Sequence, residues 1–388
     1  MNKSSKAPAQ GNVIDDVTVY EFGHQRALTI DLRNFGEYAA FAKFINGSEL
    51  VRESNASLTT LNITGEYDAN VKRIDGQTLS GSAGESTLDS TIKHLSIDLA
   101  RNESFDYAGT VFSNFDRLET VDATKSAHSS YLSFSEGGFN GRSTSAFLES
   151  IKLDNSGGNI RISTVAAAEF ESVASLHNKR VHDIDVDTGH ASASVSATVQ
   201  QADVHIKTLT GHLTVDLIFV EGVAEHNSSA HGSFGHGVNI QLSKSADNDY
   251  ITLLNGNLVN YDGMDSSDVK SDSIKSNLVK IENFNASDDY LLFGSAVTKP
   301  ETVVIVDDSA LAGAKNISSA LDIAAQLTVG PVNAAVFNYH GSTYVFDEAH
   351  ASLVAGVDSS DSLIELVGSH DLTDVAAHVV AGFRSMGH

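Results

Sequence analysis

The sequence predicts a mainly β protein, built as a β-solenoid or parallel β-helix-like stack and completed by a C-terminal mixed β module that contains one helix. Two observations support this prediction. Strand-forming residues separated by small polar residues dominate from about Val13 to Leu254, which is typical of short strands joined by polar turns. A pattern of apolar residues also recurs along this stretch, whereas helical periodicity is scarce.

The recurring pattern reads apolar-x-x-apolar-x-apolar, and its last two apolar positions alternate as in a half-buried strand. Its central positions, 61, 95, 118, 151, 173 and 184, are spaced by 34, 23, 33, 22 and 11 residues. Because these spacings are close to multiples of eleven, we expect the strands to stack as solenoid coils around one continuous core. An irregular β-sandwich is the alternative. The copies are Leu58-Leu61-Ile63, Ile92-Leu95-Ile97, Phe115-Leu118-Val121, Leu148-Ile151-Leu153, Phe170-Val173-Leu176 and Val181-Ile184-Val186.

The segment that precedes the repeats is expected to anchor the protein or to dock onto another subunit. Strands are predicted at Val17–Glu21 and Ala27–Leu32, where no local hairpin turn is evident, so these strands are candidates for exchange between subunits. A short helix is predicted at Glu37–Ile45, ended by Asn46-Gly47, since such a pair is a common helix C-cap. The expected parts are a flexible tail (1–12), this segment (13–57), the β-solenoid (58–254) and a calcium-associated assembly and secretion module (255–388).

The C-terminal module is expected to begin with an Asp-rich loop from Tyr261 to Asp272. The only long helix is predicted within Asp307–Leu327, where Ile317, Leu321, Ala324 and Leu327 are spaced for one helical face. His340-Gly341 separates two strand-forming runs and predicts a β-hairpin. The runs are Ala335–Tyr339 and Thr343–Phe346, and a last strand is predicted at Leu363–Val367.

Charge and composition exclude several classes of partner. The 388 residues contain 25 Lys and Arg against 50 Asp and Glu, so the net charge is −25. Nucleic acids and anionic membranes would be repelled, whereas divalent cations would be attracted. There is no cysteine, which suits a bacterial extracellular protein better than a disulfide-stabilised eukaryotic one.

Targeting signals are not evident in the sequence. Met1–Gln10 has no apolar signal-peptide core, and no apolar run is long enough for a transmembrane helix. The protein is therefore expected not to span a membrane, and either to stay in the cytoplasm or to leave the cell without a cleaved N-terminal signal.

Three segments place acidic residues directly before an alternating strand. Calcium takes six to eight oxygen ligands, and a turn rich in carboxylates and carbonyls can supply several of them. The alternative is that Asp and Asn simply favour turns. The segments are Asp247–Leu253, Ser287–Phe293 and Asp358–Leu366.

These segments also carry a resemblance. Asp249–Leu253 together with Ile281–Leu291, read as I-x-x-F-x-x-x-x-D-x-L, resembles the end of an RTX calcium-binding β-roll and the segment that follows it. Phe337–Phe346, with Asp361–Leu366 and Asp371–Thr373, is similar to the C-terminal module of bacterial S-layer proteins exported by type I secretion. The resemblance covers about residues 247–388. It implies an uncleaved C-terminal export signal and a calcium-rich β-solenoid that assembles into a lattice.

The glycine-rich RTX nonapeptide itself does not occur in this sequence. The acidic residues at matching positions are the candidate Ca²⁺ ligands, namely Asp247, Asp249, Asp288, Asp289 and Asp361. A second metal hypothesis concerns His226, His231 and His236, which recur every five residues. Their spacing places them on no common helical face, so only a flexible loop could gather them around a transition metal.

The expected function is that of a structural subunit of a calcium-dependent, self-assembling bacterial surface layer or extracellular filament. The chain is expected not to be an enzyme, because it has no thiol nucleophile, G-x-S-x-G, H-E-x-x-H or phosphate-binding loop. The main partner would be further copies of the chain at the cell surface. The alternatives are an adhesin or carbohydrate-binding β-solenoid with a surface polysaccharide as partner, and a polysaccharide lyase, against which the scarcity of Lys and Arg near the acids counts.

Overall fold

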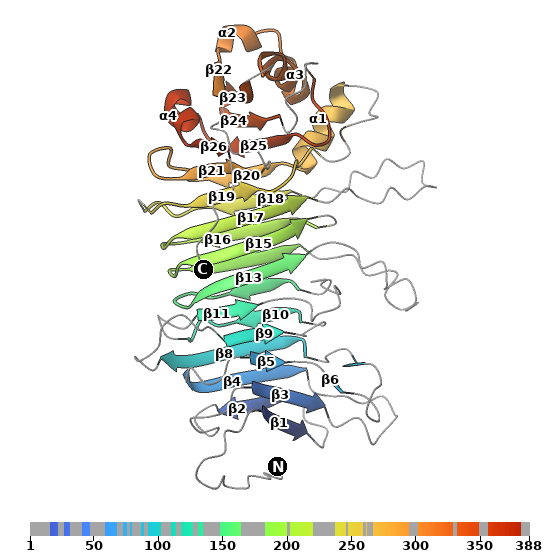
Figure 1. The fold of residues 1–388 in the computed structure, drawn as a ribbon, viewed down its shortest axis with the longest axis vertical. Helices are drawn as coiled ribbons and strands as arrows, with labels where there is room; N and C mark the ends of the chain where they lie inside the picture. The colour runs from blue at the N-terminus through green and yellow to red at the C-terminus, as the bar shows by residue number, and fades with distance from the viewer. Residues whose placement is uncertain are drawn as a thin grey trace, which may run out of the picture. The chain divides into compact units, whose positions relative to one another are not determined.

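A computed structural model of the chain gives the architecture (Figure 1). The protein is mainly β, as the sequence predicts. The structure describes residues 16–21, 27–31, 41–46, 59–67, 73–75, 78–79, 87–88, 92–101, 110–113, 118–126, 131–134, 148–163, 183–199, 202–219, 237–245, 247–258, 261, 267–294, 302–328, 332–348 and 356–381. The predicted tail (1–12), the copy Phe170-Val173-Leu176 and the three histidines at 226, 231 and 236 lie outside these ranges.

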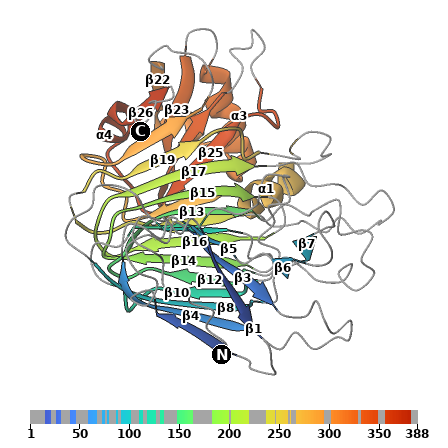
Figure 2. The same ribbon diagram turned by 60° about the horizontal axis from the view of Figure 1, so that its bottom comes forward.

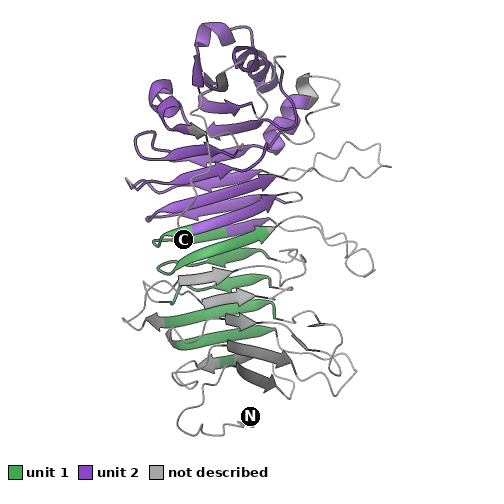
Figure 3. Cartoon of the chain, in the orientation of Figure 1, with its two compact units in different colours: residues 1–162, 167–182, 186–193 green, residues 163–166, 183–185, 194–388 purple. Residues whose placement is uncertain are grey.

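The chain divides into two compact units, coloured in Figure 3. Unit 1 comprises residues 1–162, 167–182 and 186–193, and unit 2 comprises residues 163–166, 183–185 and 194–388.

In unit 1, successive strands alternate between two sheets, and each pairs in parallel with strands of its own sheet. A separate two-stranded antiparallel ribbon joins β6 (Thr78–Leu79) to β7 (Thr87–Leu88). The first sheet contains β1 (Asp16–Glu21), β3 (Phe41–Asn46), β5 (Arg73–Asp75), β9 (Thr110–Ser113), β11 (Tyr131–Phe134) and β13 (Gly157–Ser163). The second contains β2 (Ala27–Asp31), β4 (Thr60–Tyr67), β8 (His94–Arg101), β10 (Thr120–Asp122) and β12 (Ser150–Lys152).

Buried residues of the predicted repeat stand in register in the second sheet, whose strands β8, β10 and β12 lie side by side (Figure 2). Leu61 pairs with Leu95, Leu95 with Val121, and Val121 with Ile151. All four are at most 2% exposed. The spacings are therefore 34, 26 and 30 residues, so the expected multiple of eleven is not kept.

The prediction of Leu118 as a central position is wrong, because Leu118 is only half-buried and precedes β10. Val121 occupies the core position instead. The lengths of the connections vary between strands, and only the inward side chain of each strand has to match its neighbours.

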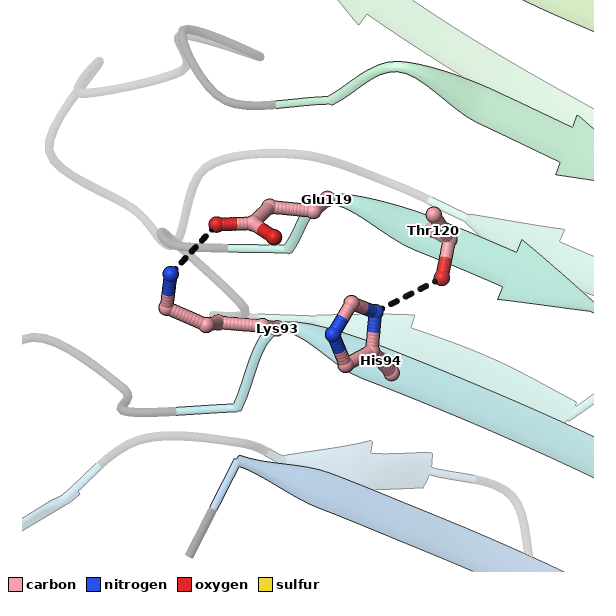
Figure 4. A network of polar contacts seen from close by, with 4 residues as sticks. All are labelled: Lys93, His94, Glu119 and Thr120. Atoms are coloured by element: carbon pink, nitrogen blue, oxygen red, sulfur yellow. Dashed lines mark hydrogen bonds and ion pairs between the residues drawn. The ribbon is translucent and has the colours of Figure 1, made fainter. Parts of the chain in front are cut away.

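Outward side chains of unit 1 also pair between neighbouring strands, as Figure 4 shows for the starts of β8 and β10. Lys93 Nζ lies 2.5 Å from Glu119 Oε1, and His94 Nδ1 lies 3.0 Å from Thr120 Oγ1. The Lys93 side chain is 42% exposed, so this ion pair contributes at most about 1 kcal/mol to stability. These contacts align the strands without forming a site.

The helix predicted at Glu37–Ile45 is wrong where the structure describes it. Residues Phe41–Asn46 form β3, which pairs in parallel with β1 and β5. Helical propensity is a weak preference that tertiary pairing overrides, and Phe and Ile also favour strands. The predicted strands before it are confirmed as β1 and β2.

Unit 2 continues the same alternation and then departs from it. Its first sheet orders β15 (Ala193–Val199), β17 (Leu213–Phe219), β19 (Tyr250–Leu253), β21 (Tyr290–Phe293) and β26 (Val379–Ala381). In its second sheet the strands follow the order β16 (Val204–Thr208), β18 (Val238–Gln241), β20 (Val279–Glu282), β25 (Ser362–Leu366), β24 (Ser342–Asp347), β23 (Val332–Tyr339) and β22 (Thr302–Val306). The strand β14 (Ile184–Gly189) has residues in both units, and so do β13 through Ser163 and β15 through Ala193.

A second buried column runs through unit 2. Val204 pairs with Val238, Val238 with Val279, and Val279 with Ile364, and all four are fully buried. The strands β16 and β18 bury every second residue, the period expected when one face of a strand packs on a core.

The segment between β21 and β25 extends the second sheet of unit 2 by β24, β23 and β22 and also contains α2 and α3. The hairpin predicted at His340-Gly341 is confirmed, since β23 and β24 are antiparallel and Tyr339 pairs with Ser342. Both turn residues have positive φ, 50° at His340 and 88° at Gly341, as a two-residue type I′ turn requires. The last predicted strand is confirmed as β25.

The C-terminal module contains more helices than the one that the sequence predicts. The described residues contain α1 (Ser267–Ser276), α2 (Asp308–Leu311), α3 (Ile317–Leu327) and α4 (Leu372–Ala377). The predicted Asp-rich loop thus ends in α1, whose Ile274 is buried in the same cluster as Leu321 and Ala324 of α3. The sequence of α1 is too polar to show helical periodicity. The helix is stabilised by the packing of its few apolar residues within unit 2.

The predicted helix over Asp307–Leu327 is divided into α2 and α3. Asn316 caps α3 by accepting a hydrogen bond from Ser319 N at 2.9 Å. Ile317, Leu321 and Ala324 are buried as expected, whereas Leu327 is 43% exposed. None of the helices in the described part of the chain is long and apolar enough to cross a membrane.

Candidate functional site

Two of the three acid-led segments lie side by side in unit 2. Asp249 directly precedes β19 and Asp289 directly precedes β21, and these strands pair in parallel with Tyr250 opposite Tyr290. The two carboxyl groups therefore occupy equivalent places on neighbouring strands. This pair is the centre of the candidate site.

Each of these carboxyl groups accepts a hydrogen bond from a backbone amide at the start of the neighbouring strand in the sheet. Asp249 Oδ1 accepts from Leu213 N at 2.7 Å, and Asp289 Oδ1 accepts from Asp249 N at 3.1 Å. Asp289 Oδ2 also accepts from Asn285 N at 2.7 Å. The side chains thus satisfy amides at the strand starts, which would otherwise be buried without a partner.

Burial makes these two carboxyl groups poor acids. Asp249 is 1% exposed and Asp289 is 2% exposed. Desolvation raises the pKa of Asp249 to about 7 and the pKa of Asp289 to about 6. The accepted hydrogen bonds lower both pKa values, but by less than desolvation raises them. The neighbouring charges of Asp247 and Asp288 raise the two pKa values further. The pKa values of both groups therefore lie well above the usual range of a carboxyl group.

Asp247 and Asp288 flank the pair and are half-buried. Asp247 Oδ2 accepts hydrogen bonds from Ser245 Oγ at 2.8 Å and from Gly211 N at 3.3 Å. Asp288 Oδ2 accepts from Asn285 Nδ2 at 2.6 Å. Four of the five candidate ligands thus gather at the starts of β19 and β21.

Asp361 is not part of this group. It lies in the turn before β25 and contacts the chain beyond the end of β19, where its carbonyl accepts from Leu258 N at 3.2 Å. Its buried Oδ2 accepts from Asp358 N at 2.8 Å. A Cβ atom at Gly256 would lie 2.0 Å from the Ser360 carbonyl oxygen, so only glycine permits this turn to pack there.

Among the residues that the structure describes, no group of three or more His, Cys, Asp or Glu side chains is placed to hold a metal ion. The carboxylates of the four clustered residues are directed largely at amides and neighbouring side chains. Calcium binding through Asp247, Asp249, Asp288, Asp289 or Asp361 therefore stays a prediction.

The geometry also explains the I-x-x-F-x-x-x-x-D-x-L segment. Its four defining residues, Ile281, Phe284, Asp289 and Leu291, are all at most 5% exposed. Ile281 and Leu291 fill the core from β20 and β21, and Asp289 closes the turn between them through Asn285 N. The motif is accounted for by folding alone.

Further capping residues were missed by the sequence reading. Asp183 accepts from Asp203 N at 3.2 Å, and Asp203 accepts from Gly237 N at 2.7 Å, at the strand starts of the second sheet. Burial raises the pKa of Asp203. The signal was present, because each of these Asp residues directly precedes a β-branched residue that opens a strand.

Aromatic side chains form a second unpredicted row, on the outward face of the first sheet. The rings of Tyr250 and Tyr290 stack with centroids 5.1 Å apart, flanked by His212 at 5.3 Å and His378 at 4.9 Å. The two tyrosine rings are nearly parallel, whereas His212 meets Tyr250 edge-on and His378 is tilted against Tyr290. These contacts link neighbouring strands of the first sheet.

Comparison with known proteins gives no match: neither a protein-family model, nor a curated protein, nor a solved structure resembles this chain.

Proposed function

We propose that this chain is a structural, non-enzymatic β-solenoid subunit that self-assembles at the bacterial cell surface, as a layer or an extracellular filament, with Ca²⁺ as a cofactor. The observation that carries the proposal is the register of buried residues from strand to strand within each unit. Leu61, Leu95, Val121 and Ile151 form one such column, and Val204, Val238, Val279 and Ile364 form another.

The solenoid is supported by the way in which the chain alternates between two sheets. Up to β20 and β21 the strands of both sheets pair in parallel with the strand of the next layer, and the inward side chains fill the interior. In such a stack every layer is held by its neighbours, which suits a structural role. Carboxyl groups such as those of Asp249 and Asp289 reinforce the contacts between layers.

The part played by calcium is supported by charge and by the clustered acids. A chain with net charge −25 repels its own copies, and bound divalent cations would remove that repulsion while ordering acidic turns. The half-buried Asp247 and Asp288 are the most accessible members of the cluster. The resemblance of residues 247–388 to the end of S-layer proteins supports a place at the cell surface.

Electron microscopy of the purified chain with added Ca²⁺, and with excess chelator, tests the proposal. We expect ordered sheets or filaments with Ca²⁺ and dispersed particles with chelator. The double variant Asp247→Asn and Asp288→Asn should need a higher Ca²⁺ concentration for the same assembly. Exposed Asp272, which lies in α1, supplies the control Asp272→Asn, which should assemble as the wild type does. Dispersed particles under both conditions would contradict self-assembly, and assemblies that persist in chelator would remove calcium from the proposal.

A further inference from the structure

The strand β22 is an open edge in unit 2. It is the last strand of its sheet, and its one neighbour is β23, to which it is parallel. Along the edge of β22 that faces away from β23, no backbone hydrogen bond joins Val303, Val304 or Ile305 to another described residue. The strand therefore presents a row of donors and acceptors that another strand could pair with.

Both faces of β22 are partly covered, so the edge is what remains open. Val304 and Val306 face the α3 layer, where Val306 is 1% exposed. Val303 and Ile305 lie opposite Ala334 and Val336 of β23, on the other face. Ile305 is 41% exposed, one of few large apolar side chains in the described residues with so much exposure.

The usual protections of an edge strand are missing within Thr302–Val306, whereas Pro300, Glu301 and Asp307 flank it in the sequence. Thr302–Val306 contains no charged residue and no proline. The single irregularity of pairing lies between Thr302 and Val303, which leaves Val303–Val306 regular. A β-branched, uncharged edge is a template for pairing with another chain.

We propose that β22 is the contact through which two copies of this chain associate, by antiparallel pairing of β22 with β22 of the second copy. The inference rests on the proposed self-assembly and names its interface. Copies that each carry a net charge of −25 can approach most closely where their surfaces carry no charge. The strand Thr302–Val306 carries no charge over its five residues, and the acidic Glu301 and Asp307 stand only at its two ends.

Twofold symmetry fixes the register of this contact. With the axis at Val304, Val304 of one copy lies opposite Val304 of the other, and Ile305 lies opposite Val303. Cross-strand pairs of β-branched residues on one face stabilise such a ladder. An isologous contact of this kind closes on itself, so it makes the dimer from which larger assemblies would grow.

A substitution tests the apolar contact. Ile305→Lys places a charge at the centre of the paired strands, and we expect it to weaken dimerisation about tenfold or more, measured by sedimentation velocity over a range of protein concentrations. The matched control is Leu327→Lys, because Leu327 is similarly exposed at 43% but lies on α3. Unchanged thermal unfolding of both variants shows that the fold is kept.

A crosslink tests the register. The natural chain contains no cysteine, so Val304→Cys introduces a single thiol that twofold pairing sets directly opposite its copy, within the Cα separation that a disulfide needs. Mild oxidation should yield a disulfide-linked dimer far faster than it does for Leu327→Cys. Equal crosslinking rates, or dimerisation of Ile305→Lys equal to wild type, would overturn the assignment to β22 and leave self-assembly standing. A wild type that stays monomeric with and without Ca²⁺ would overturn both.

Discussion

At the scale of single residues, the acidic side chains at strand starts act first as backbone caps. Asp249 and Asp289 bind the amides of Leu213 and Asp249, respectively, and lose contact with water in doing so. A carboxylate placed like this stabilises the strand start but carries the cost of a buried charge. The raised pKa values of both groups express that cost.

Stability should therefore depend on pH in a specific direction. A carboxyl group whose pKa is higher in the folded chain than in the unfolded chain binds its proton more tightly when folded. Between pH 3.8 and about 7 the folded state thus holds more protons at Asp249, so the free energy of unfolding falls as pH rises through this window. For Asp289 the same loss is complete at about pH 6.

The variant Asp249→Asn isolates this effect, because the amide oxygen can still accept from Leu213 N while the charge is gone. Above pH 7 we expect it to be more stable than the wild type by about 1–3 kcal/mol, with the difference vanishing as pH approaches 4. Urea denaturation across this pH range measures it, with Asp272→Asn, whose side chain is 78% exposed, as control. Parallel pH profiles for wild type and Asp249→Asn would refute the assignment.

At the scale of elements, one amide side chain, that of Asn257, joins the segment after β19 to the starts of β20 and β25. Asn257 Nδ2 donates to Leu363 O at 2.8 Å and to Asn277 O at 3.1 Å, while its Oδ1 accepts from Leu363 N at 2.7 Å. Asn257 is fully buried. It thereby fixes the starts of β20 and β25, which pair directly in the sheet.

Asn257→Ala should destabilise the protein by about 2–4 kcal/mol, since it leaves several buried backbone groups without their partner. The matched control is Asn239→Ala, because Asn239 is half-buried and its Nδ2 lies 3.1 Å from a single side-chain partner, His205. Chemical denaturation gives both values. A loss at Asn257 no larger than that at Asn239 would show that solvent replaces its bonds.

Elements differed in how far the sequence could predict them. His340-Gly341 was enough to predict the hairpin, because a type I′ turn is encoded by its own two residues. The residues Phe41–Asn46 were not enough to predict their own strand, because they form a strand rather than a helix by pairing with β1 and β5. Helix α1 likewise depends on α3, against which Ile274 is buried.

At the scale of the whole molecule, the net charge of −25 is the dominant property. Like charges spread over a folded chain repel one another more than in the expanded unfolded chain, which lowers stability. Adding monovalent salt at neutral pH screens this repulsion over a Debye length of about 10 Å or less. We therefore expect the melting temperature to rise by about 2–5 °C with salt.

Thermal unfolding in low and high sodium chloride measures this change, with an uncharged osmolyte of equal osmolality as control. A melting temperature that is unchanged or lower in salt would mean that local ion pairs, such as Lys93 with Glu119, outweigh the net repulsion.

The sequence by itself determined the β class, the strand-opening acids, the hairpin and the acidic character, because each is written in a few adjacent residues or in composition. It also located most of the described core positions of the recurring pattern, such as Leu61, Leu95 and Ile151. Tertiary structure alone decided that Val121 and not Leu118 completes their column. It also decided which acids meet, bringing Asp247, Asp249, Asp288 and Asp289 together and placing Asp361 elsewhere. The physical reason is that the lengths of the connections vary from strand to strand, so the partners of a strand are set by burial and backbone pairing across the layers rather than by spacing along the chain.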